Sequence, residues 1–86
     1  MPIVTVYSTD ACASCTRAKA LLDKRGLAHE EINLSRDADA RARLVEQTGR
    51  MTYPQILVGD TVVGGFEELV AAERSGRLAA LLAEAA

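Results

Sequence analysis

The spacing of hydrophobic residues changes between strand-like and helix-like several times along the chain. Ile3–Tyr7 is β-branched or aromatic throughout, which predicts a buried strand. From Cys12 or Ala13 onward, apolar residues recur three and four positions apart, the spacing of an amphipathic helix. We expect this helix to end at Gly26, because glycine adopts the left-handed backbone of a helix C-terminus without steric cost.

The rest of the chain continues this alternation. His29–Leu34 predicts a second strand with Ile32 and Leu34 facing the core, and Ser35 is a candidate cap for a helix that runs to about Gln47. The last part predicts two strands at 53–58 and 61–63 joined by a tight turn, a helix at 66–75, and a final helical turn or two at 78–85.

The predicted order is strand, helix, strand, helix, strand, strand, helix, which belongs to the α/β class. Helices between the first three strands imply parallel crossovers, whereas the last two strands imply an antiparallel hairpin. We therefore expect a four-stranded mixed sheet with helices on both faces. A chain of 86 residues has the length of one small domain, so we assign residues 1–86 to a single domain.

Composition and charge exclude several functional classes. Ten basic and twelve acidic residues give a net charge of −2, without the basic excess typical of DNA-binding domains. Aromatic residues make up only 3% of the chain, which disfavours base stacking with nucleic acid. The apolar runs are too short to span a membrane, and no signal peptide is visible at the start. These features predict a cytoplasmic protein, and we expect a monomer.

Two cysteines, Cys12 and Cys15, form a C-x-x-C pair where the first strand gives way to a helix. The first sulfur then lies at a helix N-terminus, where unpaired N–H groups and the helix dipole stabilise a thiolate. Cys12 is therefore the candidate nucleophile and Cys15 the thiol that resolves a mixed disulfide. The pair could instead be two small buried residues, or half of a zinc site. A zinc site needs two further ligands, and His29 is the single histidine of the sequence.

The chain resembles a glutaredoxin from Val4 to about Leu82, which implies a thioredoxin-like fold. The C-x-x-C pair alone is a moderately specific signal, but its combination with Thr-x-Pro and Gly-Gly further along is a strong one. The resembling stretches are Val6-Tyr7, Cys12-x-x-Cys15, Arg17–Leu22, Thr48-Gly49-Arg50, Thr52-x-Pro54-Gln55-Ile56 and Gly64-Gly65-x-Glu67-Glu68-Leu69.

The resemblance implies a thiol–disulfide oxidoreductase that reduces protein disulfides and glutathione mixed disulfides. Glutathione would be the electron donor and co-substrate, with no cofactor bound permanently and no metal at the site. In the family, a cis proline faces the nucleophile, and the backbone before it pairs with the peptide-like substrate. The residues implied to bind glutathione are Arg41, Thr52, Tyr53, Pro54, Gly65, Phe66 and Glu67.

Each implied contact has a physical basis. The first N–H groups of the helix at Phe66 and Glu67 suit the γ-glutamyl carboxylate, and the Glu67 side chain suits its ammonium group. Arg41 matches a position that meets the glycyl carboxylate in the family. Simpler interpretations stay open: Pro54 as an ordinary proline at a strand start, Gly65 as part of a turn, and Arg41 as a solvated helix residue.

The sequence departs from the family at four positions near the cysteines and the proline. Ala13 and Ser14 replace the usual Pro-Tyr between the cysteines, and Tyr53 replaces a valine, where it could partly cover the cleft. Thr9 stands where a lysine or arginine commonly helps to hold the thiolate.

These departures leave two other functions to consider. One is a redoxin that serves ribonucleotide reductase and is recharged by thioredoxin reductase. The other is a module that binds a metal or an iron–sulfur cluster, with thiolates from the Cys12 residues of two copies and with glutathione.

Overall fold

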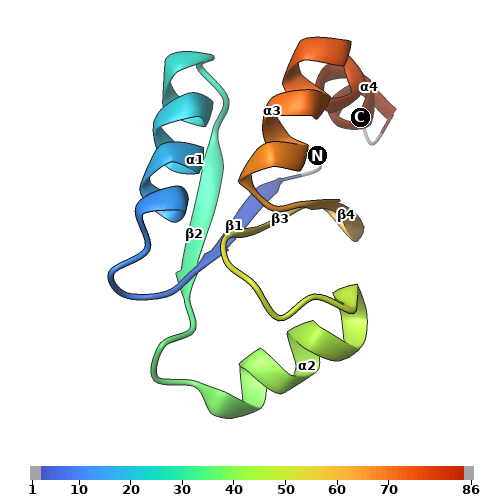
Figure 1. Ribbon diagram of the computed structural model, residues 1–86. Coiled ribbons are helices and arrows are strands. Elements are labelled where there is room, and N and C mark those ends of the chain that lie inside the picture. Colours follow the sequence, from blue (N-terminus) through green and yellow to red (C-terminus); the bar gives the residue numbers. More distant parts are fainter. Residues whose placement is uncertain (1–2, 85–86) are drawn as a thin grey trace.

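The computed structural model of this chain describes residues 3–84, and its helices and strands follow the predicted order (Figure 1). A last helix, α4, confirms the predicted final helical turns, of which Ala85 lies outside the described residues. The elements are β1 (Val4–Ser8), α1 (Ala13–Lys24), β2 (His29–Asn33), α2 (Ala38–Thr48), β3 (Gln55–Val58), β4 (Thr61–Gly64), α3 (Phe66–Ser75) and α4 (Arg77–Glu84).

The four strands form one mixed sheet in the order β2-β1-β3-β4. β1 and β2 are parallel, as predicted, and β3 and β4 form the predicted antiparallel hairpin. The expectation of a second parallel crossover is wrong, because β3 runs antiparallel to β1. The last residue of β2, Asn33, pairs with Ser8, and the first residue of β3, Gln55, pairs with Tyr7. The segment that contains α2 therefore begins and ends at the same end of the sheet.

The sheet is covered on both faces, as predicted. α1 and α3 cover one face, and the core beneath them includes Val6, Leu22, Ile56 and Leu69, none of which is exposed. α2 covers part of the other face and lies beneath one end of the sheet (Figure 1). α4 packs against α3, and no helix within residues 3–84 has the length and apolar character needed to cross a membrane.

Several details of the α2 region differ from the sequence predictions. Asp37, and not Ser35, caps α2: its Oδ1 accepts the N–H of Ala40 at 3.0 Å. The Ser35 hydroxyl is engaged elsewhere, since it accepts the N–H of Asp10 at 2.7 Å. Leu34 is buried as predicted, but the expectation that Ile32 faces the core is wrong: Ile32 lies on β2, at the edge of the sheet, and is 37% exposed.

Polar contacts connect β2 to its neighbours. The buried Ser8 hydroxyl donates to Glu31 Oε2 at 2.7 Å, and Lys19 Nζ of α1 donates to the same oxygen at 2.9 Å. The bond from Ser8, followed by that from Lys19, lowers the pKa of Glu31 below its ordinary value. His29, the single histidine of the sequence, has a side chain only 13% exposed, and its Nδ1 lies 3.2 Å from Leu27 O.

Candidate active site

The two cysteines lie at the start of α1, as the sequence predicted. Cys12 is the N-cap residue, and its Sγ accepts the N–H of Cys15 at 3.1 Å. The cysteines form a disulfide with a Cα–Cα distance of 5.2 Å. Cys12 is half-buried, whereas Cys15 is only 2% exposed. A disulfide partner from solution therefore reaches Cys12 first, and Cys15 is placed to attack a mixed disulfide from inside.

A loop at residues 49–54 joins α2 to β3 and contains a cis peptide bond between Tyr53 and Pro54. The adjacent Gln55 is fully buried, and its side chain ties this loop to the end of α2. Its Oε1 accepts from Thr48 Oγ1 at 2.7 Å, and its Nε2 donates to Arg50 O at 2.9 Å. Both polar groups of the buried amide are thus satisfied, which holds the loop beside the sheet.

The N-terminus of α3 forms the opposite wall of the site. Gly65 is the N-cap residue, and Glu68 Oε1 accepts its N–H at 2.8 Å, which is the half of a capping box that the side chain of the third helical residue supplies. Arg50 Nη2 donates to the same oxygen at 2.9 Å, so this ion pair links the loop at 49–54 to α3. The bond from Gly65, helped by the charge of Arg50, lowers the pKa of Glu68.

These walls and the first turns of α1 enclose a cavity of about 270 Å³. Six of the residues expected to bind glutathione line it: Thr52, Tyr53, Pro54, Gly65, Phe66 and Glu67. Four further lining residues were not assigned to the site from the sequence: Ser14, Arg17, Arg50 and Glu68. Arg17, Arg50 and Glu68 do lie within the motifs that carry the resemblance, which is the signal that could have found them.

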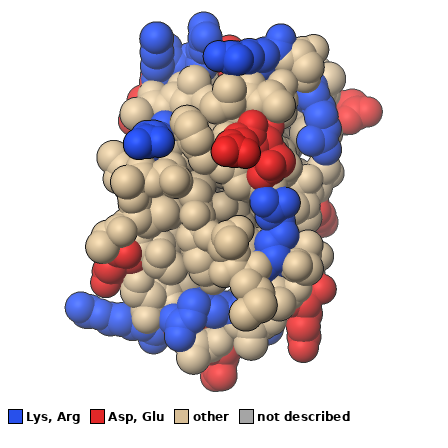
Figure 2. All heavy atoms as spheres, viewed as in Figure 1, with Lys and Arg blue, Asp and Glu red and all other residues tan. Residues whose placement is uncertain are grey.

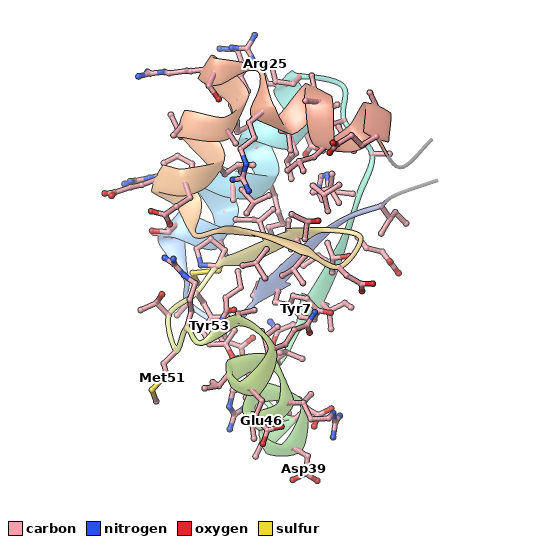
Figure 3. The ribbon with its side chains drawn as sticks, turned by 90° about the vertical axis from the view of Figure 1, so that its right-hand side faces the viewer. Tyr7, Arg25, Asp39, Glu46, Met51 and Tyr53 are labelled. Atoms are coloured by element: carbon pink, nitrogen blue, oxygen red, sulfur yellow. A yellow bond between two sulfur atoms is a disulfide. The ribbon has the colours of Figure 1, made fainter. Side chains whose placement is uncertain are left out.

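The side chain of Tyr53 does more than line the cavity. It packs against the cluster of Leu34, Leu44 and Leu57 beneath α2. In Figure 3 Tyr53 lies on the α2 side of its loop, while Met51, which is 79% exposed, points outward. The tyrosine therefore anchors its loop on α2, in addition to the predicted contact with the cleft.

Arg41 is the one expected glutathione-binding residue that does not line this cavity. Its Nη1 donates to the carbonyl oxygens of Leu34 and, at 2.9 Å, of Ser35. Both hydrogens of Nη1 are thereby engaged, while Nε and Nη2 carry three further N–H donors.

The charges around the site are mixed. Figure 2 shows acidic and basic side chains interspersed, with no broad basic area among the described residues of that face. Within residues 3–84, no three His, Cys, Asp or Glu side chains gather into a group that could hold a metal ion.

Comparison with known proteins identifies the family. Residues 4–63 match the sequence profile of the family described as Glutaredoxin. The chain belongs to the glutaredoxin family. It is 45% identical to a glutaredoxin of Pseudomonas aeruginosa over 95% of this chain and 98% of that protein. It is 35% identical to glutaredoxin 3 of Escherichia coli, over 95% of this chain and 99% of that protein.

Solved glutaredoxin structures share the fold. A buckwheat glutaredoxin–glutathione complex superposes with a TM-score of 0.85 at 30% identity, over 96% of this chain and 78% of that one. A glutaredoxin from Brucella melitensis superposes with a TM-score of 0.81 at 43% identity, over 95% of this chain and 89% of that one. The four-stranded mixed sheet with flanking helices is thus a thioredoxin-like fold, and membership in this family implies thiol–disulfide exchange at the Cys12–Cys15 pair.

Proposed function

We propose that this glutaredoxin reduces protein disulfides and glutathione mixed disulfides with glutathione as the electron donor. The observation that carries the proposal is the cavity between the loop at 49–54, the N-terminus of α3 and the first turns of α1. This cavity brings the N-terminus of α3 and the loop at 49–54 beside α1, whose N-cap residue is Cys12. A similar protein, from buckwheat, has been solved in complex with glutathione.

The reaction begins with the reduced pair. The Cys12 thiolate attacks the glutathione sulfur of a mixed disulfide, so that a Cys12–glutathione disulfide forms and the target protein leaves as a thiolate that takes up a proton. A second glutathione thiolate then attacks the sulfur of the bound glutathione, which yields glutathione disulfide and regenerates the Cys12 thiolate. For a disulfide within a protein, Cys12 forms a mixed disulfide with one target sulfur and the other target sulfur leaves as a thiolate. Cys15 then attacks Cys12 Sγ, which releases the target as a dithiol and forms the Cys12–Cys15 disulfide. Two glutathione molecules reduce this disulfide and leave as glutathione disulfide.

Three groups of residues are proposed to bind the different parts of glutathione. The N–H groups of Phe66 and Glu67 in the first turn of α3 suit the γ-glutamyl carboxylate, and the exposed Glu67 side chain suits the ammonium group. The backbone of Tyr53, beside Thr52 and the cis Pro54, suits the extended peptide part of the ligand. The free N–H groups of Arg41 are assigned to the glycyl carboxylate.

Two arginines supply the positive charge at the cavity. Thr9 supplies no cation, but Arg17 of α1 and Arg50 both line the cavity. Arg50 is paired with Glu68, whereas Arg17 forms no ion pair with any residue in the described part of the chain. Arg17 thus leaves a positive charge available to an anionic ligand.

The test is a coupled assay with a glutathionylated substrate and two alternative electron sources. We expect turnover with glutathione, glutathione reductase and NADPH. Turnover with thioredoxin reductase and NADPH, and none with the glutathione system, would contradict the proposal and favour the redoxin function. Absorbance near 400 nm in anaerobically purified protein, together with no turnover in either assay, would favour an iron–sulfur module.

A further inference from the structure

The loop that precedes Cys12 has an unusual backbone. Ala11, the residue directly before the N-cap, has a φ of 54°, and it is the one non-glycine residue with positive φ in the described chain, residues 3–84. Residues with a Cβ atom rarely adopt this left-handed conformation, because Cβ approaches the following carbonyl oxygen. The turn nevertheless sets the direction in which the chain enters α1, and so the position of the Cys12 sulfur. Something else in the structure must hold it.

A closed ring of hydrogen bonds connects this loop to the end of β2. The N–H of Asp10 donates to Ser35 Oγ at 2.7 Å, and Asn33 Nδ2 donates to Asp10 Oδ1 at 2.9 Å. The N–H of Ser35 donates in turn to Asn33 Oδ1 at 2.9 Å, which closes the ring. Asn33 and Ser35, which we call the 33–35 clamp, therefore hold both the backbone and the side chain of Asp10, one residue before Ala11.

The clamp is itself held by Arg41 of α2. Arg41 Nη1 donates to the carbonyl oxygens of Leu34 and Ser35, and Arg41 as a residue is half-buried. The contacts run in sequence from Arg41 through Ser35 to Asp10, which lies two residues before Cys12. No other arginine in the described part of the chain donates to this segment.

We propose that Asn33, Ser35 and Arg41 are positioning residues for Cys12. By holding Asp10, they keep Ala11 in its left-handed conformation and the Cys12 sulfur at the N-terminus of α1. Arg41 thereby has a second role besides its proposed contact with the glycyl carboxylate of glutathione. The positioning role depends only on the thiol chemistry of Cys12. Without the clamp, the loop relaxes toward ordinary backbone angles, and the sulfur loses its contact with the N–H of Cys15.

The experiment measures the reactivity of Cys12 without any glutathione. In a Cys15→Ser background Cys12 is the single thiol, and its alkylation by iodoacetamide is followed across pH. We expect Asn33→Ala and Arg41→Ala each to slow alkylation at pH 7 by about three- to tenfold, the effect of about one lost hydrogen bond on the population of the reactive loop. The pH midpoint of alkylation is expected to move upward in both variants.

A charge-matched control and a rescue separate positioning from general destabilisation. Arg43→Ala removes an exposed arginine from the same helix and is expected to leave the alkylation rate unchanged. Adding Ala11→Gly to the Asn33→Ala variant is expected to restore much of the rate, because glycine adopts the positive φ without the clamp.

Two results would overturn the proposal. One is an alkylation rate in Asn33→Ala and Arg41→Ala equal to that of Arg43→Ala. The other is a slow Asn33→Ala variant that Ala11→Gly does not speed up, since the loop backbone would then not be what the clamp holds. Because the assay contains no glutathione, either result is independent of whether the protein uses glutathione as electron donor.

Discussion

Replacing Gly65 by valine tests whether the N-terminus of α3 receives the main chain of a ligand. The backbone of Gly65 is extended, with φ −91° and ψ −162°, so a β-branched residue fits its conformation. A Cβ atom there would lie 3.1 Å from Glu68 Oε1 and 3.6 Å from both Arg50 Nη2 and Pro54 O. The side chain therefore enters the cavity from its wall, between the groups that define it.

The effect on stability is expected to be modest. The Glu68 carboxylate must move by a few tenths of an ångström, which weakens its bonds to the Gly65 N–H and to Arg50. A hydrogen bond contributes about 0.5–1.5 kcal/mol, and the partly exposed ion pair with Arg50 contributes less, so we expect a loss of about 1–2 kcal/mol. A domain stabilised by about 5–15 kcal/mol remains folded after such a loss.

The effect on the ligand is expected to be larger. The two methyl groups of valine occupy the space between α3 and Pro54 into which an extended peptide would fit. We expect the KM for glutathione to rise tenfold or more, which corresponds to about 1.4 kcal/mol of lost binding. Steady-state kinetics with glutathione and a glutathionylated substrate measure this change. Reduction of a small disulfide by dithiothreitol, where neither reactant contains glutathione, measures the thiol–disulfide exchange activity that the variant retains.

Gly76→Ala serves as the matched control for stability. Gly76 ends the same helix with a φ of 84° and has nothing within 4 Å of an added Cβ, so alanine there costs about 1–2 kcal/mol without entering the cavity. Urea unfolding of both variants checks that their stabilities match. An unchanged KM in Gly65→Val would refute the assignment of this helix terminus to glutathione, and equal losses on both substrates would show damage to the thiol site instead.

Three further predictions concern the thiols and their surroundings. Cys12→Ser is expected to abolish every thiol transfer, whereas Cys15→Ser should retain deglutathionylation and lose reduction of disulfides within proteins. Equal loss of both reactions in Cys15→Ser would exclude a reaction in which a second glutathione releases the glutathione bound to Cys12 without help from Cys15. Thr9→Lys is expected to lower the pKa of the reduced Cys12 by up to about one unit, because a cation beside the sulfur favours thiolate, as measured by absorbance near 240 nm across pH. The lowered pKa of Glu31 stabilises the fold above the ordinary value of 4.5, and this contribution is lost as pH falls through the folded-state value. Glu31→Gln should therefore be less stable than the parent at pH 7 in urea unfolding, with a difference that shrinks below pH 4.5; a constant difference would contradict the pKa shift.

The parts of the fold and site that the sequence predicted correctly depend on local patterns. The C-x-x-C pair lies at a helix N-terminus because a β-branched run ends just before it and an amphipathic spacing begins just after it. Gly65 lies at the start of α3 for a similar reason, since it separates a short strand from a helical pattern. The sequence did not distinguish Asp37 from Ser35 as the cap of α2, because both are good N-cap residues. In the structure Asp37 caps the helix, while the hydroxyl of Ser35 accepts the N–H of Asp10.

The sequence by itself determined the class of fold, the order of its elements and the identity of the reactive pair, because backbone preference and hydrophobic period act over a few neighbouring residues. Tertiary structure alone decided the direction of β3, because that depends on how α2 packs across the end of the sheet. Tertiary structure also decided which arginines line the cavity. Arg17 and Arg50 line it, while Arg41 donates to the carbonyl oxygens of Leu34 and Ser35. A long, flexible side chain can reach in several directions from one backbone position, and only the groups that folding brings near it determine which of them it binds.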